Sequence, residues 1–143
     1  MSIKQVSVIL ENVPGMFLAV SECLGREAIN IRAISVADTS GTSTVRFVPD
    51  NPEKTLSVLR ANGYKVVEND VLAVEIPDHP GAMQAILKPL REANINVLYF
   101  YTFLGRGESG QPIVIIGVDR TGDAADALKK NWVHMFGKEI YSL

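Results

Sequence analysis

Apolar and polar residues alternate at the start of the chain and then change to a helical spacing. From Ile3 to Glu11, every second residue is apolar in one set (Val6, Val8, Leu10), which predicts a strand with one buried face. From Met16 to Glu27 the apolar residues follow a spacing of three or four positions, which predicts an amphipathic helix. The first 27 residues therefore predict a strand followed by a helix.

The same two periods continue through the rest of the first half. Strands are expected at Ile29–Val36, Ser43–Val48 and Tyr64–Glu68. A second helix is expected to begin at Pro52 and to end at Asn62-Gly63, since proline favours a first helical turn and glycine a helix C-terminus. The predicted order is βαββαβ.

The second half repeats this pattern 66 positions later. Strands are expected at Val71–Ile76, Ile95–Leu104, Pro112–Val118 and Gly137–Ser142, and helices at Ala82–Ala93 and Asp123–Lys130. Core positions and turn positions match together at this offset. We therefore expect an α+β chain of two domains, 1–69 and 70–143, joined directly at Asn69-Asp70.

The most distinctive repeated segment is the corner between the first strand and the first helix. It reads Asn12-Val13-Pro14-Gly15 in one copy and Asp78-His79-Pro80-Gly81 in the other. Proline holds the preceding residue extended, glycine permits a tight turn, and Asn or Asp is a residue type that caps helix amides. Each corner is expected to leave backbone N–H groups free at a helix N-terminus, where a carboxylate can bind.

Composition and charge exclude several classes of protein. The chain is 47% hydrophobic with a formal net charge of −2, so it is globular and lacks the basic stripe that nucleic acids require. Its apolar runs are too short to cross a bilayer, and its N-terminal residues show no signal-peptide pattern. We expect a cytoplasmic protein in which the lone cysteine, Cys23, is buried and inert.

No residue pattern recommends a catalytic or metal site. The two histidines, His79 and His134, have no partnered nucleophile, and no cluster has the spacing of metal ligands. The glycine-rich segment Gly105–Gln111 lacks the following helix and the Gly-Lys-Ser/Thr of a phosphate loop, so we expect a mobile hairpin tip. No catalytic residue, metal or cofactor is therefore assigned.

The paired corners, each followed fifteen residues later by Asn30-Ile31 or Asn96-Val97, resemble the ACT-domain family of small-molecule regulatory modules. The resemblance extends over nearly the whole chain. It implies two ferredoxin-like domains with antiparallel four-stranded sheets and helices on one face. In this family, modules associate side by side through the first helix and second strand and bind amino acids at that seam.

Carried over to this chain, the family's seam implies a specific set of ligand-binding residues. The implied set is Asn12, Val13, Pro14, Gly15, Met16, Phe17, Leu18, Asn30 and Ile31 in the first copy, and Asp78, His79, Pro80, Gly81, Ala82, Met83, Asn96 and Val97 in the second.

The chemistry of these residues suits a free amino acid. Helix amides can bind its carboxylate, and Asn or Asp oxygens can bind its ammonium group. Because Asp78 is charged and Asn12 is neutral, the two sites are expected to be unequal, with one occupied. The sequence does not identify the amino acid. Each asparagine could alternatively serve only to cap a loop.

Partner surfaces are expected on the second domain. Val97–Leu104 and Ile113–Ile116 are apolar on both faces, so the face without helices should meet another sheet, which predicts a homodimer or larger assembly. Alternatively, Tyr99 and Tyr101 lie at the surface by their hydroxyl groups. The function expected is a non-catalytic regulator that responds to an amino acid and acts on an enzyme or regulator encoded elsewhere; the alternative is an ACT-fold interaction scaffold without ligand.

Overall fold

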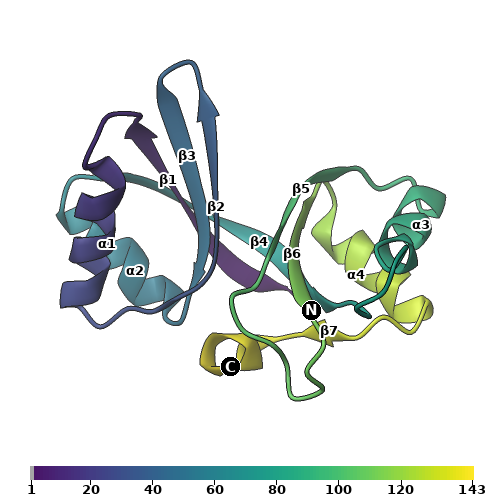
Figure 1. Ribbon diagram of the computed structural model, residues 1–143. Coiled ribbons are helices and arrows are strands. Elements are labelled where there is room, and N and C mark those ends of the chain that lie inside the picture. Colours follow the sequence, from purple (N-terminus) through teal and green to yellow (C-terminus); the bar gives the residue numbers. More distant parts are fainter. Residues whose placement is uncertain (1) are drawn as a thin grey trace. The chain divides into compact units, whose positions relative to one another are not determined.

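The computed structural model describes residues 2–143, and its chain divides into two compact units (Figure 1). The N-terminal unit is Lys4–Asn69. The C-terminal unit is Asp70–Leu143, together with the residues at the start of the chain up to Ile3. Among the described residues, no helix is both long and apolar enough to cross a membrane.

The N-terminal unit contains two helices and an antiparallel sheet in the predicted order. Its elements are β1 (Ile3–Glu11), α1 (Met16–Arg26), β2 (Ile31–Thr39), β3 (Thr42–Pro49), α2 (Pro52–Ala61) and the first part of β4 (Lys65–Glu75). The strands lie in the order β2-β3-β1-β4, and β3 pairs antiparallel with both β1 and β2. This is the strand order of a ferredoxin-like domain.

Both helices of this unit cover the same face of the sheet. The buried cluster combines alternate residues of β1 and β3 with one side of α1 and with Leu59 of α2. Its buried members are Val6, Val8, Leu10, Val20, Cys23, Leu24, Ile29, Val45, Phe47 and Leu59. The alternation in β1 and the helical spacing in α1 are what bring these side chains to one layer. Cys23 is buried, as predicted.

The C-terminal unit repeats the arrangement. It consists of the second part of β4, α3 (Gln84–Glu92), β5 (Val97–Thr102), β6 (Ile113–Val118), α4 (Thr121–Lys130), β7 (Met135–Phe136) and the short 3-10 helix η1 (Lys138–Ser142). β4 pairs antiparallel with β6 on one side and β7 on the other, and β5 pairs with β6. The order β7-β4-β6-β5 is the order of the first unit, with each strand at the equivalent place.

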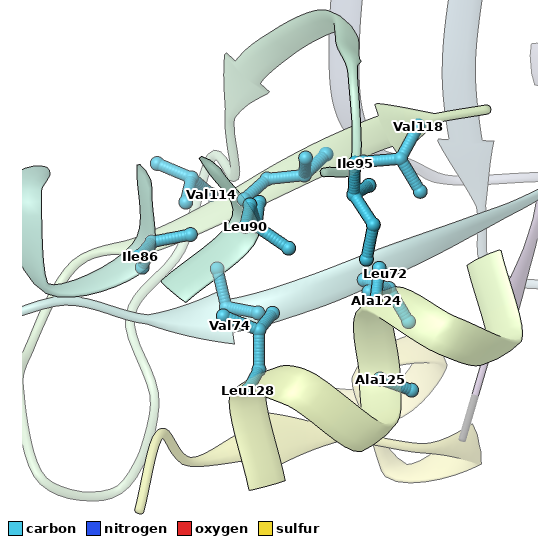
Figure 2. Close-up of a cluster of buried hydrophobic side chains, with 11 residues drawn as sticks. Leu72, Val74, Ile86, Leu90, Ile95, Val114, Val118, Ala124, Ala125 and Leu128 are labelled. Atoms are coloured by element: carbon cyan, nitrogen blue, oxygen red, sulfur yellow. The ribbon is translucent and has the colours of Figure 1, made fainter. Parts of the chain in front are cut away.

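Its core is likewise a single layer between sheet and helices (Figure 2). Side chains from β4 and β6 meet Ile86 and Leu90 of α3 and Leu128 of α4. Pro89 lies inside α3 and is itself buried. The predicted fold of two ferredoxin-like βαββαβ domains is confirmed.

Two predicted strand boundaries are wrong. Asn69 and Asp70 do not form a connection, because β4 runs without interruption from Lys65 to Glu75. Neither residue is a glycine or proline, and the nearby residues Val66, Val67 and Val71 favour an extended backbone, although Asn and Asp themselves are uncommon in strands. One strand therefore closes the first βαββαβ unit and opens the second.

The last predicted strand, Gly137–Ser142, is also wrong. The strand lies earlier, at Met135–Phe136, and Lys138–Ser142 forms the 3-10 helix. The Glu139 carboxylate accepts a hydrogen bond of 2.9 Å from the N–H of Gly137, which caps this turn. A local side-chain cap has replaced the strand pairing expected from apolar alternation.

The face of β6 away from the helices is not left open, contrary to the expectation from the sequence. Ile113 and Ile115 on that face are at most 1% exposed within the single chain. Gly107 lies so near that a Cβ there would be 3.1 Å from the Phe136 ring, and the Arg106 guanidinium donates to the carbonyl of Gly110. The segment Gly105–Gln111 thus contacts Phe136 and bonds within itself, and its mobility stays a prediction.

Candidate functional site

The first corner leaves helix donors free. Gly15 precedes α1 in the left-handed conformation, with φ of 88°, and no side chain caps the helix. The N–H of Met16 bonds the Val13 carbonyl at 3.4 Å, and the N–H of Ala19 bonds the Gly15 carbonyl. Within residues 2–143, the N–H groups of Gly15, Phe17 and Leu18 have no acceptor. These three groups form an open donor set at a helix N-terminus.

Asn12 does not cap this helix, which corrects the role expected from its residue type. Its side-chain Nδ2 donates to Asp38 Oδ1 at 3.0 Å, and its backbone N–H donates to the Gly41 carbonyl at 2.8 Å. Both partners lie at the tip of the β2–β3 hairpin. Asn12 therefore ties the corner to the hairpin and brings a carboxylate to it, one that the sequence analysis missed.

The first corner thus combines three kinds of chemistry. The free amides can bind a carboxylate, the Asp38 carboxylate can bind an ammonium group, and exposed Val13, Phe17 and Leu18 supply apolar surface. Met16 is half-buried against the core of the unit, and Pro14 is exposed. Donors and an acidic acceptor beside apolar side chains are what a free zwitterionic amino acid requires.

The second corner is built differently. Helix α3 begins at Gln84, because residues 79–83 form tight turns in which the N–H groups of Ala82, Gln84 and Ala85 each bond the carbonyl three residues back. Asp78 gives no side-chain cap to α3, so this expectation is also wrong. His79 places Nδ1 2.9 Å from the Pro80 carbonyl oxygen and is exposed. More of the backbone N–H groups at this corner than at the first corner therefore already have a carbonyl acceptor.

Asp78 contacts the hairpin loop of its own unit through both its side chain and its backbone. Its carboxylate lies 3.9 Å from the Arg106 guanidinium, and its N–H donates to the Gln111 side-chain carbonyl. The two corners therefore differ in the charge that each presents. Asp78 faces a cation, whereas neutral Asn12 brings in Asp38, so the first corner offers the better acceptor for an ammonium group.

The two asparagines are held in a duplicated reciprocal pair. The N–H of Asn30 donates to Asp50 Oδ1 at 3.1 Å, and the N–H of Asp50 returns a bond to the Asn30 carbonyl at 2.9 Å. Asn96 and Asp119 repeat both bonds, each at 3.2 Å. The aspartates end β3 and β6, so each pair locks the start of one strand to the end of the next.

The structure does not bring the corner and the asparagine together within a unit. The corner precedes α1 and Asn30 follows it, so the two lie at opposite ends of a helix about 16 Å long, as Figure 1 shows for α1. The same holds for α3 between Asp78 and Asn96. Asn30 and Asn96 are exposed, whereas Ile31 and Val97, which begin β2 and β5, are half-buried; Ala82 and Met83 pack toward the core.

An apolar groove lies beside the first corner. It has a volume of about 260 Å³ between α1 and β2, lined chiefly by Phe17, Val20, Leu24, Ile34 and Val36. Ile34 and Val36 pair with the core residues Phe47 and Val45, so they lie on the helix side of the sheet, at an edge strand that the helices leave uncovered.

The second unit repeats this uncovered edge. Phe100 of β5 pairs with the core residue Ile116 and is 51% exposed, near exposed Leu98 on the same strand. The sequence analysis predicted the partner surface of this unit on the opposite face of the sheet, the one without helices.

Among residues 2–143, no group of three or more His, Cys, Asp or Glu side chains could hold a metal ion.

Comparison with known proteins identifies the family. The chain belongs to the ACT domain pair family, whose sequence model matches residues 1–141. Domains of this family are regulatory modules. No curated protein matches the chain.

Solved structures agree with this assignment. Protein BT0572 from Bacteroides thetaiotaomicron is 28% identical, with a TM-score of 0.91, over 100% of this chain and 98% of that one. The regulatory subunit of aspartate kinase from Thermus thermophilus, in its ligand-free form, is 15% identical with a TM-score of 0.62, over 90% and 91% of the two chains. The regulatory subunit from Thermus flavus is 14% identical with a TM-score of 0.60, over 90% and 92%. The last two share the fold.

Proposed function

We propose that this chain is a non-catalytic regulatory protein that binds a free amino acid at its first corner. The observation that carries the proposal is the set of unpaired N–H groups at Gly15, Phe17 and Leu18, on a corner whose Asn12 side chain bonds the carboxylate of Asp38. The ligand carboxylate accepts from the amides and its ammonium group donates to Asp38. Membership of the ACT domain pair family supports a small-molecule regulatory role.

The affinity expected is that of a metabolite sensor. Hydrogen bonds to charged groups contribute roughly 1.5–3 kcal/mol each, and two or three of them, less the cost of ordering, correspond to a Kd of about μM to mM. Apolar Val13, Phe17 and Leu18 favour a ligand with an apolar side chain. The second corner is expected to bind more weakly, because the Arg106 guanidinium lies 3.9 Å from Asp78 and competes with a ligand ammonium group.

The site is completed, in this proposal, by an ACT domain of a second copy of the chain. The exposed apolar edge of α1 and β2 supports side-by-side association, with the Asn30-Ile31 or Asn96-Val97 end of the partner brought to the corner. Since the two ends of α1 are about 16 Å apart, one domain cannot supply both. The homodimer and the ligand site are therefore coupled.

The target of regulation is a separate enzyme or regulator in the cytoplasm. Solved structures of the same fold include regulatory subunits of aspartate kinase, which supports action on a separate polypeptide. A buried free cysteine suits a reducing compartment.

A thermal-shift assay against the twenty amino acids tests the proposal. We expect a few related amino acids to raise the Tm at millimolar concentration and the others to have no effect. No stabilisation by any of them would contradict it.

The second candidate is an interaction scaffold without ligand, favoured by the apolar groove between α1 and β2. It predicts that the chain associates through this groove with the same affinity whether or not amino acids are present.

A further inference from the structure

Just after the C-terminal end of α4 lies a residue whose backbone conformation and exposure are both unfavourable for its residue type. The single tryptophan of the chain, Trp132, is 93% exposed and has a φ of +62°. A left-handed backbone costs a side-chain-bearing residue energy that glycine does not incur, and an exposed indole gains nothing from burial.

The repeat shows which residue this position takes when only the fold matters. In the first unit, the N–H of Gly63 bonds the Arg60 carbonyl and the N–H of Tyr64 bonds the Leu59 carbonyl. Trp132 and Val133 make the same two bonds to Lys129 and Leu128. Asn62 and Asn131 precede them, each with its side-chain amide bonded to the carbonyl four residues back at 2.8 Å.

Gly63-Tyr64 in the first unit corresponds to Trp132-Val133 in the second unit. The aromatic side chain of the pair is therefore packed against the core in the first unit and exposed in the second. Tyr64 is half-buried and packs against the core of its unit. At the equivalent place the smaller Val133 packs against the core of the C-terminal unit, and a cavity of about 370 Å³ borders it. Trp132 lies at the rim of this cavity.

The lining of the cavity indicates the class of ligand. Ile76 and Pro77 after β4, Ile86 of α3 and Val133 give it apolar walls, and the polar residues Glu75, Asn131 and His134 also line it. Gln111 also lines it, with its carbonyl oxygen occupied by the N–H of Asp78, so that its NH₂ group is the part left to donate. A volume of this size holds one small molecule.

We propose that this cavity is a second ligand site, for a small neutral aromatic molecule with a hydrogen-bond acceptor. The ring stacks on the indole of Trp132 between the apolar walls, and the acceptor receives a hydrogen bond from the Gln111 amide. The site is contained in the C-terminal unit and does not depend on the amino-acid site at the first corner.

Fluorescence of the only tryptophan reports on this site directly. Benzamide is the probe, because it has a ring and an amide carbonyl but neither the carboxylate nor the ammonium group that the first corner would bind. We expect a saturable change in Trp132 emission. Cyclohexanecarboxamide, which has the same amide without the aromatic ring, should bind about tenfold more weakly.

Two variants locate the response. Val133→Tyr restores the residue of the first unit and fills the cavity, so the benzamide response should be lost while Trp132 remains as reporter. Trp132→Gly should unfold at an equal or higher temperature than the parent chain and lose the stabilisation by benzamide. Ala28→Gly is its control, since Ala28 also has a positive φ, of 55°, at a helix end, and this variant should keep the benzamide response.

The proposal is overturned if benzamide causes no saturable change in Trp132 emission at tens of millimolar (about the weakest binding worth assigning). It is equally overturned if Trp132→Gly keeps the full thermal stabilisation by benzamide, or if a folded Val133→Tyr protein keeps the fluorescence response.

Discussion

Asn12 donates its side-chain amide to the Asp38 carboxylate at 3.0 Å, across 26 positions of sequence. This bond joins the only acidic group of the β2–β3 tip to the corner that precedes α1. The equivalent corner of the second unit has the opposite arrangement, with the acid on the corner and the cation, Arg106, on the hairpin loop. The two corners therefore differ in charge as well as in where the helix begins.

Asp38→Asn should weaken amino-acid binding without unfolding the protein. The substitution keeps a hydrogen-bond acceptor for Asn12 and removes the charge that pairs with the ligand ammonium group. We expect the Kd to rise about 10- to 100-fold, measured by isothermal titration calorimetry. Asp126→Asn, an exposed acid on α4, is the control and should leave the Kd unchanged. An unchanged Kd in Asp38→Asn would remove Asp38 from the site.

Gly15→Ala and Gly25→Ala should have opposite effects on stability. A Cβ meets nothing within 4 Å at either position, so sterics do not distinguish them. Gly15 has a φ of 88°, which costs alanine about 1–2 kcal/mol. Gly25 lies within α1, where alanine gains about 0.5–1 kcal/mol. Urea unfolding measures both, and a stabilised Gly15→Ala protein would contradict the corner geometry.

Asp50→Ala and Asp119→Ala should destabilise the protein similarly. Each removes the acceptor of the Asn30 or Asn96 N–H, a loss of about 1 kcal/mol. Hydrogen exchange should accelerate at the N–H of the matching asparagine and leave the other one protected. If the N–H groups of both asparagines kept equal protection in both variants, the reciprocal pairs would not be what holds the strands together.

Ile34→Glu should dissociate the proposed dimer. The side chain lies on the exposed apolar edge of β2, and a carboxylate there would have to lose its hydration on association. Sedimentation equilibrium should show a dimer for the parent chain and a monomer for the variant. Val67→Glu, at an exposed valine of β4, is the control and should remain a dimer. A dimeric Ile34→Glu protein would place the interface elsewhere.

Glu139 should give stability that is lost in acid. The hydrogen bonds from the N–H groups of Gly137 and of Glu139 itself, with a smaller contribution from the charge of His134, hold the pKa of Glu139 below its usual value. Because the folded-state pKa is the lower one, this stability is present above the unfolded pKa, about 4.3, and disappears as the pH falls through the folded value. Glu139→Gln should flatten that part of the Tm profile; an identical profile in both proteins would count against the cap.

The fold could be predicted because its signals are local. Alternation in β1, helical spacing in α1 and the matching positions 66 residues later each depend on neighbouring side chains. The corners were located for the same reason. Glycine and proline restrict their own backbone wherever they occur.

The partners of the corners could not be predicted in this way. Asn12 was assigned a local cap, but it bonds Asp38 because the hairpin folds back onto the corner. Asp50 and Asp119 were missed because the longer loop in the second half shifts the repeat after Gly105, and at the fixed offset the two aspartates do not align. Realigning the halves after this loop would have paired them, and would also have placed Trp132 opposite Gly63.

The most direct test is a ¹⁵N NMR titration of the chain with an amino acid that raises its Tm. If the ligand carboxylate binds the first corner, the amide signals of Gly15, Phe17 and Leu18 should shift together and saturate, with smaller shifts at Gly81 and Met83. Saturating shifts elsewhere, with these three amides unmoved, would contradict the proposed site.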